Sequence, residues 1–329
     1  MYFTPNKDFK ICSEEEYPEF IARVTPLIEE ASISGSHESF DGLKLSYRYI
    51  KVENAKASVV ILHGLTEFMQ KYYEMAWYLL NSGYNVFLYD QRGHGLSGRE
   101  VDDPHIVHVN DFMDYARDLD SFMKGVVEPN CEGTPIYLCS HSMGGAVVFL
   151  YLSRFDNPVK KAAFSSPMIE PKTAALPRPV LIHFFRKQRK KEGPTGKFIY
   201  SGTWNPDPDF NKATDKSYNR FLSNLNIRRA DIRYQNSSSS NAWIDESYEI
   251  RSKLLDRKYI SKIKIPMLVM LADDDTLVKT STTLRFVKLN KNIEVAHISN
   301  SKHTIYTSSP EAISEFYRRL IEYYDKTES

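Results

Sequence analysis

The sequence predicts an α/β fold in which a mostly parallel, doubly wound sheet carries an inserted, mainly helical cap. Short apolar runs rich in Val, Ile and Leu recur along the chain, and helical patterns separate them, which is typical of such a sheet. The alternation stops over residues 168–262, a stretch too long for one crossover helix. We therefore expect a core formed by residues 1–167 and 263–329, and a cap subdomain formed by residues 168–262.

The predicted elements begin with an acidic-capped helix over residues 13–31 and a hairpin whose strands, at about 36–40 and 43–52, flank Asp41-Gly42. Buried strands are expected at residues 58–62, 86–89, 136–139, 162–164, 267–271 and 293–298. Helices are expected at about 70–82, 110–128, 143–155, 279–289 and 309–325.

Composition narrows the class of protein. The 329 residues are 42% hydrophobic and 26% charged, which is ordinary for a globular protein, and a net charge of +1 gives no general reason to expect nucleic acid as a partner. The sequence has no P-loop and no His-Glu-x-x-His motif, so we expect neither a cofactor nor a metal. No apolar stretch approaches 18 residues and no secretory signal is evident, which favours a cytoplasmic location.

A candidate nucleophile follows the strand predicted at 136–139. The segment Ser140-His-Ser142-Met-Gly144-Gly145 joins this strand to a helix, which is the strand–turn–helix context of a nucleophile elbow. The turn is so sharp that the residues around the nucleophile must be small, and Ser140 stands where the usual pattern has its first glycine. We predict Ser142 as the nucleophile because it precedes x-Gly-Gly; the alternative is that Ser142 only caps the helix.

A serine hydroxyl needs a base, and in this arrangement an acid and then a histidine follow the serine along the chain. His303 lies just past the last predicted strand, and we prefer it to His297, which lies within that strand. Asp273, Asp274 and Asp275 all follow the strand at 267–271, at the end where sites form in open α/β sheets. The residues themselves leave the choice among these three acids open.

Two further loops carry glycines near the predicted site. An oxyanion hole needs two N–H donors, which we assign to Met143 and to Leu65, in the loop that begins with His63 and Gly64. His63 is expected to hold this loop. Residues 93–98 fit Gly-x-Gly-x-x-Gly, but several strands precede them and a loop follows, so we expect a tight turn and no nucleotide site.

Five motifs occur in one order: Val60-Ile-Leu-His-Gly-Leu65, Tyr89-Asp-Gln-Arg-Gly-His-Gly-Leu-Ser-Gly98, Ser140-His-Ser-Met-Gly-Gly145, Leu271-Ala-Asp-Asp-Asp-Thr-Leu-Val278 and Ser301-Lys-His303. Together they resemble the α/β-hydrolases of the monoacylglycerol lipase and lysophospholipase L2 group, over most of residues 40–325. The resemblance implies Asp275 as the acid, because Ala272 stands where the family has the glycine of its Gly-x-x-Asp segment. Residues 241–247 resemble a lysophospholipase L2 segment and favour that branch.

The resemblance implies a serine hydrolase that cleaves a carboxylic ester, lysophospholipid or monoacylglycerol, through an acyl-enzyme on Ser142. The alternatives are a short-chain carboxylesterase, a serine aminopeptidase-like hydrolase, or a catalytically silent binding module. Trp204 and Trp243, with two phenylalanines at 184 and 185, could line an acyl-chain channel or form the core of the cap. The basic run at 186–191 could contact anionic lipid transiently, although such runs are more often solvated.

Overall fold

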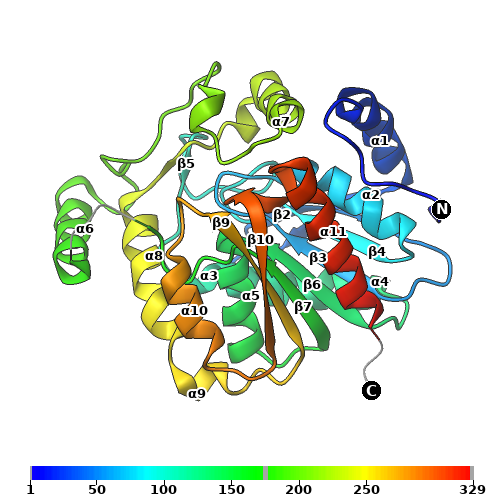
Figure 1. Ribbon diagram of the computed structural model, residues 1–329. Coiled ribbons are helices and arrows are strands. Elements are labelled where there is room, and N and C mark those ends of the chain that lie inside the picture. The colour runs from blue at the N-terminus through cyan, green and yellow to red at the C-terminus, as the bar shows by residue number, and fades with distance from the viewer. Residues whose placement is uncertain (1, 173–176, 327–329) are drawn as a thin grey trace.

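The structure, a computed structural model, describes residues 2–172 and 177–326. Residues 1 and 327–329 of the predicted core and residues 173–176 of the predicted cap lie outside the described residues. Eight strands form one sheet in the spatial order β1-β2-β4-β3-β6-β7-β9-β10 (Figure 1). They are β1 (Ile33–Glu38), β2 (Lys44–Ile50), β3 (Ser58–Leu62), β4 (Asn85–Tyr89), β6 (Ile136–His141), β7 (Val159–Ser165), β9 (Met267–Asp274) and β10 (Ile293–Lys302). β2 pairs antiparallel with β1 and β4, and the other neighbours are parallel, so the predicted sheet is confirmed.

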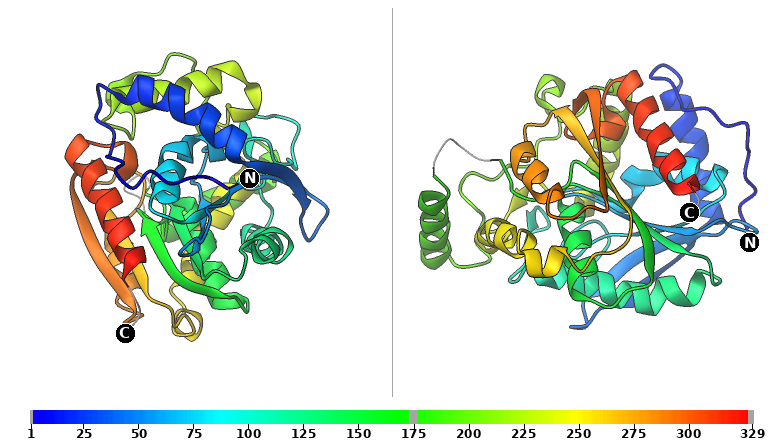
Figure 2. Two further views of the ribbon diagram at one scale, coloured as in Figure 1. Left: turned by 90° about the vertical axis from the view of Figure 1, so that its right-hand side faces the viewer. Right: turned by 60° about the horizontal axis from the view of Figure 1, so that its bottom comes forward.

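Helices cover both faces of the sheet (Figure 2). One face carries α2 (Tyr73–Asn81), with α1 (Tyr17–Ala31) packed on it, and α11 (Pro310–Asp325). The other face carries α3 (Met113–Phe122), α5 (Met143–Arg154), α8 (Asn241–Leu254) and α10 (Thr280–Val287). The described residues also form short helical segments: η1 (Met69–Tyr72), the π-helical η2 (Met123–Val127), α4 (Glu128–Asn130), η3 (Phe210–Lys212), η4 (Ile232–Tyr234) and η5 (Ile305–Thr307).

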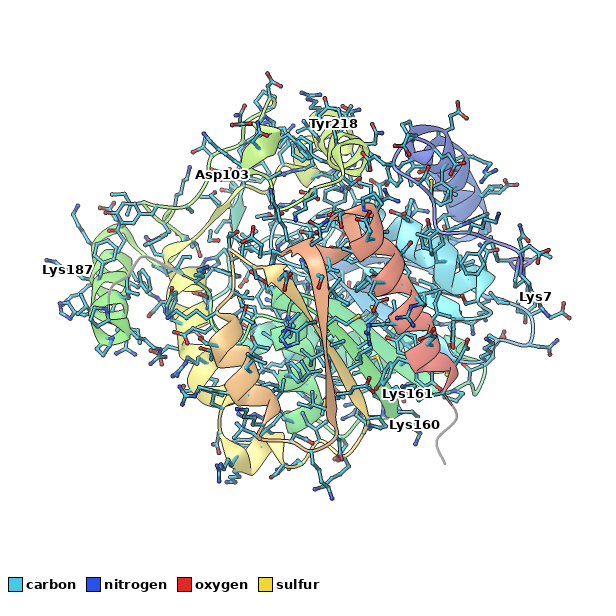
Figure 3. All side chains as sticks on the ribbon, in the orientation of Figure 1. Lys7, Asp103, Lys160, Lys161, Lys187 and Tyr218 are labelled. Atoms are coloured by element: carbon cyan, nitrogen blue, oxygen red, sulfur yellow. The ribbon has the colours of Figure 1, made fainter. Side chains whose placement is uncertain are left out.

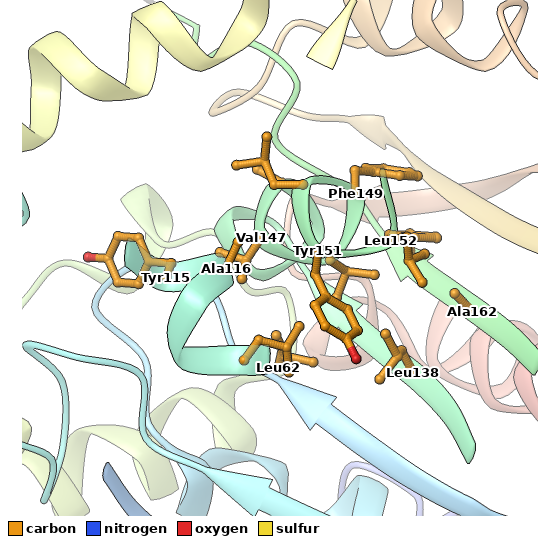
Figure 4. Close-up of a cluster of buried hydrophobic side chains, with 14 of the residues drawn as sticks. Leu62, Tyr115, Ala116, Leu138, Val147, Phe149, Tyr151, Leu152 and Ala162 are labelled. Atoms are coloured by element: carbon orange, nitrogen blue, oxygen red, sulfur yellow. The ribbon is translucent and has the colours of Figure 1, made fainter. Parts of the chain in front are cut away.

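The two-faced packing follows from the strand sequences. In β3, Val60 and Leu62 point to the α3 and α5 side, whereas Val59 and Ile61 point to the α2 and α11 side. All five β3 residues are buried, as expected for a central parallel strand. Figure 4 shows the α5 side, where the Phe149 ring belongs to the cluster over the sheet and stacks on Phe164 with centroids 4.0 Å apart.

The stretch predicted as a cap, residues 168–262, has two parts. α6 (Arg178–Glu192) and α7 (Tyr218–Ala230) lie away from the faces of the sheet, α7 beyond the carboxyl ends of the strands (Figure 1). In contrast, α8 and α9 (Arg257–Ile260) pack against α5 as part of the core. A two-stranded sheet of β5 (Ile106–Val107) and β8 (Ser238–Ser239) joins the second part to the core.

The last strand is longer than the pattern predicted. β10 was expected to end at 298, but after a register shift it pairs again at Lys302, opposite Asp274 of β9. The irregularity includes Asn300, which has φ 54°. His303 therefore follows directly on the strand end, so the pairing of two strands sets its position.

Candidate functional site

Ser142 occupies the sharp turn between β6 and α5. Its backbone has φ 51° and ψ −116°, a conformation that residues other than glycine rarely adopt. Its N–H donates to the carbonyl of Ser165 at 3.0 Å, and its own carbonyl accepts from Met168 and Gly145 at 2.9 Å each. These hydrogen bonds to the neighbouring strand and helix stabilise the strained turn.

The glycines after Ser142 are required by close packing. A Cβ on Gly144 would lie 2.7 Å from the carbonyl oxygens of Leu62 and His63, and one on Gly145 would lie 2.6 Å from Cβ of Pro167. Both distances are shorter than real Cβ contacts. Ser140, where the usual pattern has a glycine, is buried at the end of β6 and is accommodated there.

Three predicted residues meet at the carboxyl ends of three strands. His303 Nε2 lies 2.8 Å from Ser142 Oγ, and His303 Nδ1 lies 2.7 Å from Asp275 Oδ2. The other oxygen of Asp275 accepts the N–H groups of Leu277 and Val278, at 2.9 and 3.0 Å. The result is an unbroken chain from carboxylate to imidazole to hydroxyl, the arrangement in which a histidine can take a proton from a serine.

The electrostatics of Asp275 favour its charged form. Burial by itself would raise the pKa of this carboxyl, but the hydrogen bond from His303 and the N–H groups at 277 and 278 outweigh burial and hold the pKa below its ordinary value. Asp273 and Asp274 are exposed, and so is His297. Of the three acids and two histidines considered from the sequence, the structure brings Asp275 and His303 to Ser142.

A cavity of about 490 Å³ opens beside Ser142 and His303. Leu65 lines it, and Met143, buried, is the first residue of α5. The loop that carries Leu65 is held by His63, whose Nε2 accepts from Gln91 N–H at 2.9 Å and whose Nδ1 lies 2.8 Å from the carbonyl of Gly64.

The aromatic residues considered for an acyl channel divide between three environments. Trp243 lines the cavity while packing 6.3 Å from Phe112 in the core. Trp204 is not among the residues that line the cavity; its ring lies 4.8 Å from the guanidinium of Arg228, which does line it. Phe184 and Phe185 belong to a separate apolar cluster between α6 and α8.

The basic run lies on α6. Arg186 and Arg189 form ion pairs with Glu249 and Asp245 of α8, at 2.9 and 3.1 Å. The lysines of the run are exposed, and Lys187 projects outward from the edge of the molecule (Figure 3).

Residues 93–98, which fit Gly-x-Gly-x-x-Gly, form a tight turn, as predicted. The N–H of Gly93 donates to the carbonyl of Gly98 at 2.9 Å and closes this turn.

A buried polar cluster centred on Glu67 lies next to the site and is absent from the predictions made from the sequence. This carboxylate accepts from Lys71 at 2.6 Å, Tyr72 at 2.6 Å, the N–H of Gly64 at 2.7 Å and Tyr306 at 3.2 Å. Burial opposes its ionisation, but the positive charge of Lys71 and these hydrogen bonds hold the pKa of Glu67 far below its ordinary range. The spacing of four between Glu67 and Lys71 is a signal that could have found the pair.

The part of the chain that the structure describes has neither a candidate metal site nor a membrane-spanning helix. No group of three or more His, Cys, Asp or Glu residues there could hold a metal ion. None of its helices is both long enough and apolar enough to pass through a bilayer.

The sheet order, the strained serine turn and the residues at its strand ends define a serine hydrolase of the α/β-hydrolase class. The chain belongs to the Hydrolase_4 family, described as serine aminopeptidase, S33, whose model matches residues 53–309. The resemblance noted in the sequence is thereby confirmed.

Individual relatives agree with this class. The chain is 28% identical to lysophospholipase L2 of Escherichia coli K12 over 264 residues, which are 79% of this chain and 75% of the relative. It is 30% identical to monoglyceride lipase of Saccharomyces cerevisiae over 142 residues, 40% of this chain and 44% of that one. A crystal structure of a soluble variant of the yeast lipase superposes with TM-score 0.70 at 22% identity, covering 89% of this chain and 95% of the other, and supports the fold.

Proposed function

We propose that this protein hydrolyses carboxylic esters of single-chain lipids, lysophospholipids or monoacylglycerols, through an acyl-enzyme on Ser142. The observation that carries the proposal is the hydrogen-bonded chain of Asp275, His303 and Ser142 beside a cavity. The names of the relatives, lysophospholipase L2 and monoglyceride lipase, support lipid esters as the substrate class.

In the first step, Ser142 Oγ attacks the ester carbonyl carbon while its proton passes to His303 Nε2, 2.8 Å away. Asp275 keeps the imidazole in the tautomer that accepts this proton and stabilises its positive form. The N–H groups of Leu65 and Met143 bind the oxyanion, at the loop after β3 and the N-terminus of α5. The tetrahedral intermediate collapses, and the leaving alcohol takes the proton from His303.

In the second step, a water molecule gives its proton to His303 and attacks the acyl carbon. The fatty acid leaves, and the proton returns to Ser142 Oγ. His303 Nε2 takes up and releases the proton in both steps, so no second acid or base is needed.

The cavity wall supports an acyl chain as the bound group. Core and cap both contribute apolar side chains to it: Leu65, Phe68, Met168, Phe221, Leu225, Trp243, Leu277 and Val278. A volume of about 490 Å³ falls in the range of small-molecule sites. We propose Trp243 as a substrate contact and the part of residues 168–262 that includes α7, whose side chains line the cavity, as the cap that selects the substrate.

Replacement of the nucleophile tests the proposal. Ser142→Ala should lower kcat on a monoacylglycerol by at least about 10⁴-fold, because serine and histidine act as a unit. Ser140→Ala, a change of the same size two residues earlier, should retain activity and still react with a fluorophosphonate probe. Near-wild-type turnover by Ser142→Ala would refute the role of Ser142, and failure of the wild type to react with the probe would favour a silent binding module.

The family description favours one second candidate, an aminopeptidase-like activity on the same residues. A panel of monoacylglycerols, lysophospholipids, short nitrophenyl esters and amino-acid arylamides would separate the candidates. We expect kcat/KM to be highest on the long-chain lipid esters. Highest activity on the short nitrophenyl esters or on the arylamides would replace the lipid proposal with a short-chain esterase or a peptidase.

We further propose a cytoplasmic location with transient contact to anionic membrane surfaces through α6. Lys187 and Lys190 support this contact because they are exposed on that helix, away from the ion pairs made by the neighbouring arginines. Each exposed lysine near such a surface contributes about 1 kcal/mol of attraction.

A further inference from the structure

Arg228 differs from the other arginines in its part of the cap. Arg220, Arg229 and Arg233 each pair with a carboxylate: Glu74 at 2.6 Å, Asp207 at 3.6 Å and Asp231 at 2.6 Å respectively. Arg228 has no such partner among the residues that the structure describes. Its guanidinium donates to the backbone carbonyls of Tyr234 and Asn236, and its flat face lies 4.8 Å from the ring of Trp204.

Arg228 also lies in the wall of the cavity beside Ser142, where a ligand could supply the partner. α7 lines the cavity with Phe221, Asn224, Leu225 and Arg228, the spacing of one helix face. Arg228 is therefore the one of these four that brings a positive charge into the space beside Ser142. Burial lowers its pKa to about 10, with the charge of Glu67 acting in the opposite direction. A partly buried cation without a counter-charge is costly, and an anion in the cavity would remove that cost.

The nearby carboxylates do not serve as that anion. Glu67 is occupied by Lys71, Tyr72 and the N–H of Gly64. Asp215, also in the cavity wall, accepts from the hydroxyl of Thr307. Lys71, the ion-pair partner of Glu67, lies in the same wall and is close enough for the charge of Arg228 to act on it, so its ammonium group adjoins the same space.

We infer that Arg228, supported by Lys71, binds the phosphate of a lysophospholipid headgroup while the ester of that lipid lies at Ser142. The inference rests on the proposed ester hydrolysis and makes it more specific. The backbone carbonyls use Nε and one N–H of Nη2, so the remaining N–H groups at the Nη1 end of the guanidinium are left for phosphate oxygens. Lys71, although paired with Glu67, adds further N–H donors. A monoacylglycerol has no charged group for these residues, so they distinguish between the two lipid classes.

The test compares two substrates with the same oleoyl chain, 1-oleoyl-lysophosphatidylethanolamine and 1-oleoylglycerol. Arg228→Gln should lower kcat/KM on the phospholipid by about 10- to 100-fold, the size expected for a charge-assisted contact. On 1-oleoylglycerol the change should stay within about 3-fold. The matched control is Arg229→Gln, the same substitution on the next residue of α7, outside the cavity wall, which should leave both values unchanged.

Equal losses on the two substrates, or no loss on either, would overturn the phosphate site. The wild-type enzyme gives a second measurement that does not depend on the folding of a variant. Glycerol 3-phosphate should inhibit hydrolysis of 1-oleoylglycerol competitively, whereas glycerol at the same concentration should not. Absence of this inhibition, or equal inhibition by inorganic phosphate, would overturn the assignment to a lipid headgroup.

These outcomes are distinguishable from failure of the proposed function. If only the phosphate site is wrong, the wild-type enzyme still hydrolyses 1-oleoylglycerol and still reacts with a fluorophosphonate at Ser142. If ester hydrolysis itself is wrong, the wild-type enzyme cleaves neither lipid, whether or not the reagent labels Ser142.

Discussion

The two walls of the cavity at Ser142 are built in different ways. The core wall consists of strand ends and the turns that follow them, and Ser142, Asp275 and His303 are held there by paired strands and backbone hydrogen bonds. The cap wall is one face of α7 and nearby loops, which contribute side chains but no part of the sheet. The positions of the three catalytic residues therefore depend on the sheet. Selection of the substrate depends on a helix whose side chains can be replaced without moving a strand.

Apart from replacement of the nucleophile itself, the largest effect should come from a minimal change in the core wall. Asp275→Asn keeps the size of the side chain but favours the wrong tautomer of His303, so kcat should fall by roughly 10³- to 10⁴-fold. Asp274→Asn, the same substitution on the exposed neighbour, should leave kcat within about 2-fold. Steady-state kinetics on one ester substrate measures kcat for both variants. Similar losses of kcat in the two variants would contradict the assignment of Asp275 as the acid.

The Asp275→Asn variant should also differ from wild type in how its free energy of unfolding depends on pH, measured by urea unfolding at several pH values. Because the pKa of Asp275 is lowered in the folded protein, its contacts stabilise the fold above the unfolded-state pKa of about 3.9. This contribution is lost as the pH falls through the lower folded-state pKa. The difference in free energy of unfolding between wild type and Asp275→Asn should therefore be greatest above about pH 5 and shrink toward pH 3.

Phenylalanine truncations compare the packing of the two regions. Phe149→Ala removes a ring stacked on Phe164 in the main core and should cost about 3–5 kcal/mol of global stability. Phe185→Ala affects the small cluster with Leu181, Phe198 and Tyr248, which can open without unfolding the sheet. Its cost in global stability should be smaller. Urea unfolding of both variants measures the difference, and equal losses would show that α6 and the core unfold as one unit.

The smallest effect concerns the surface of the cap. The double variant Lys187→Gln/Lys190→Gln should bind anionic vesicles at least about tenfold more weakly than wild type at low salt. Its control is Lys7→Gln/Lys10→Gln, which removes the same charge from exposed residues at the opposite edge of the molecule, where Lys7 is seen in Figure 3. Vesicle co-sedimentation in which the two double variants bind equally would end the proposal of membrane contact through α6.

The sequence predicted the sheet well because each central strand is an apolar run buried on both faces. It predicted the cap less completely, since residues 241–260 form helices whose pattern does not say whether they pack on the sheet or over the cavity. The placement of Trp204 under Arg228, outside the cavity wall, had no signal in the sequence. Contacts between segments far apart in the chain decide such positions.

The positions of the strands along the chain, the serine turn and the residue types at the strand ends were determined by the local sequence, because periodicity, small residues and chain order are local properties. The residues themselves left the choice among three adjacent aspartates open, although the resemblance implied Asp275. Only the tertiary structure showed that Asp275 reaches His303, and that Arg228 has no counter-charge among the described residues. The physical reason is that a hydrogen bond or a missing ion partner depends on distances of a few ångströms between residues separated by tens or hundreds of positions.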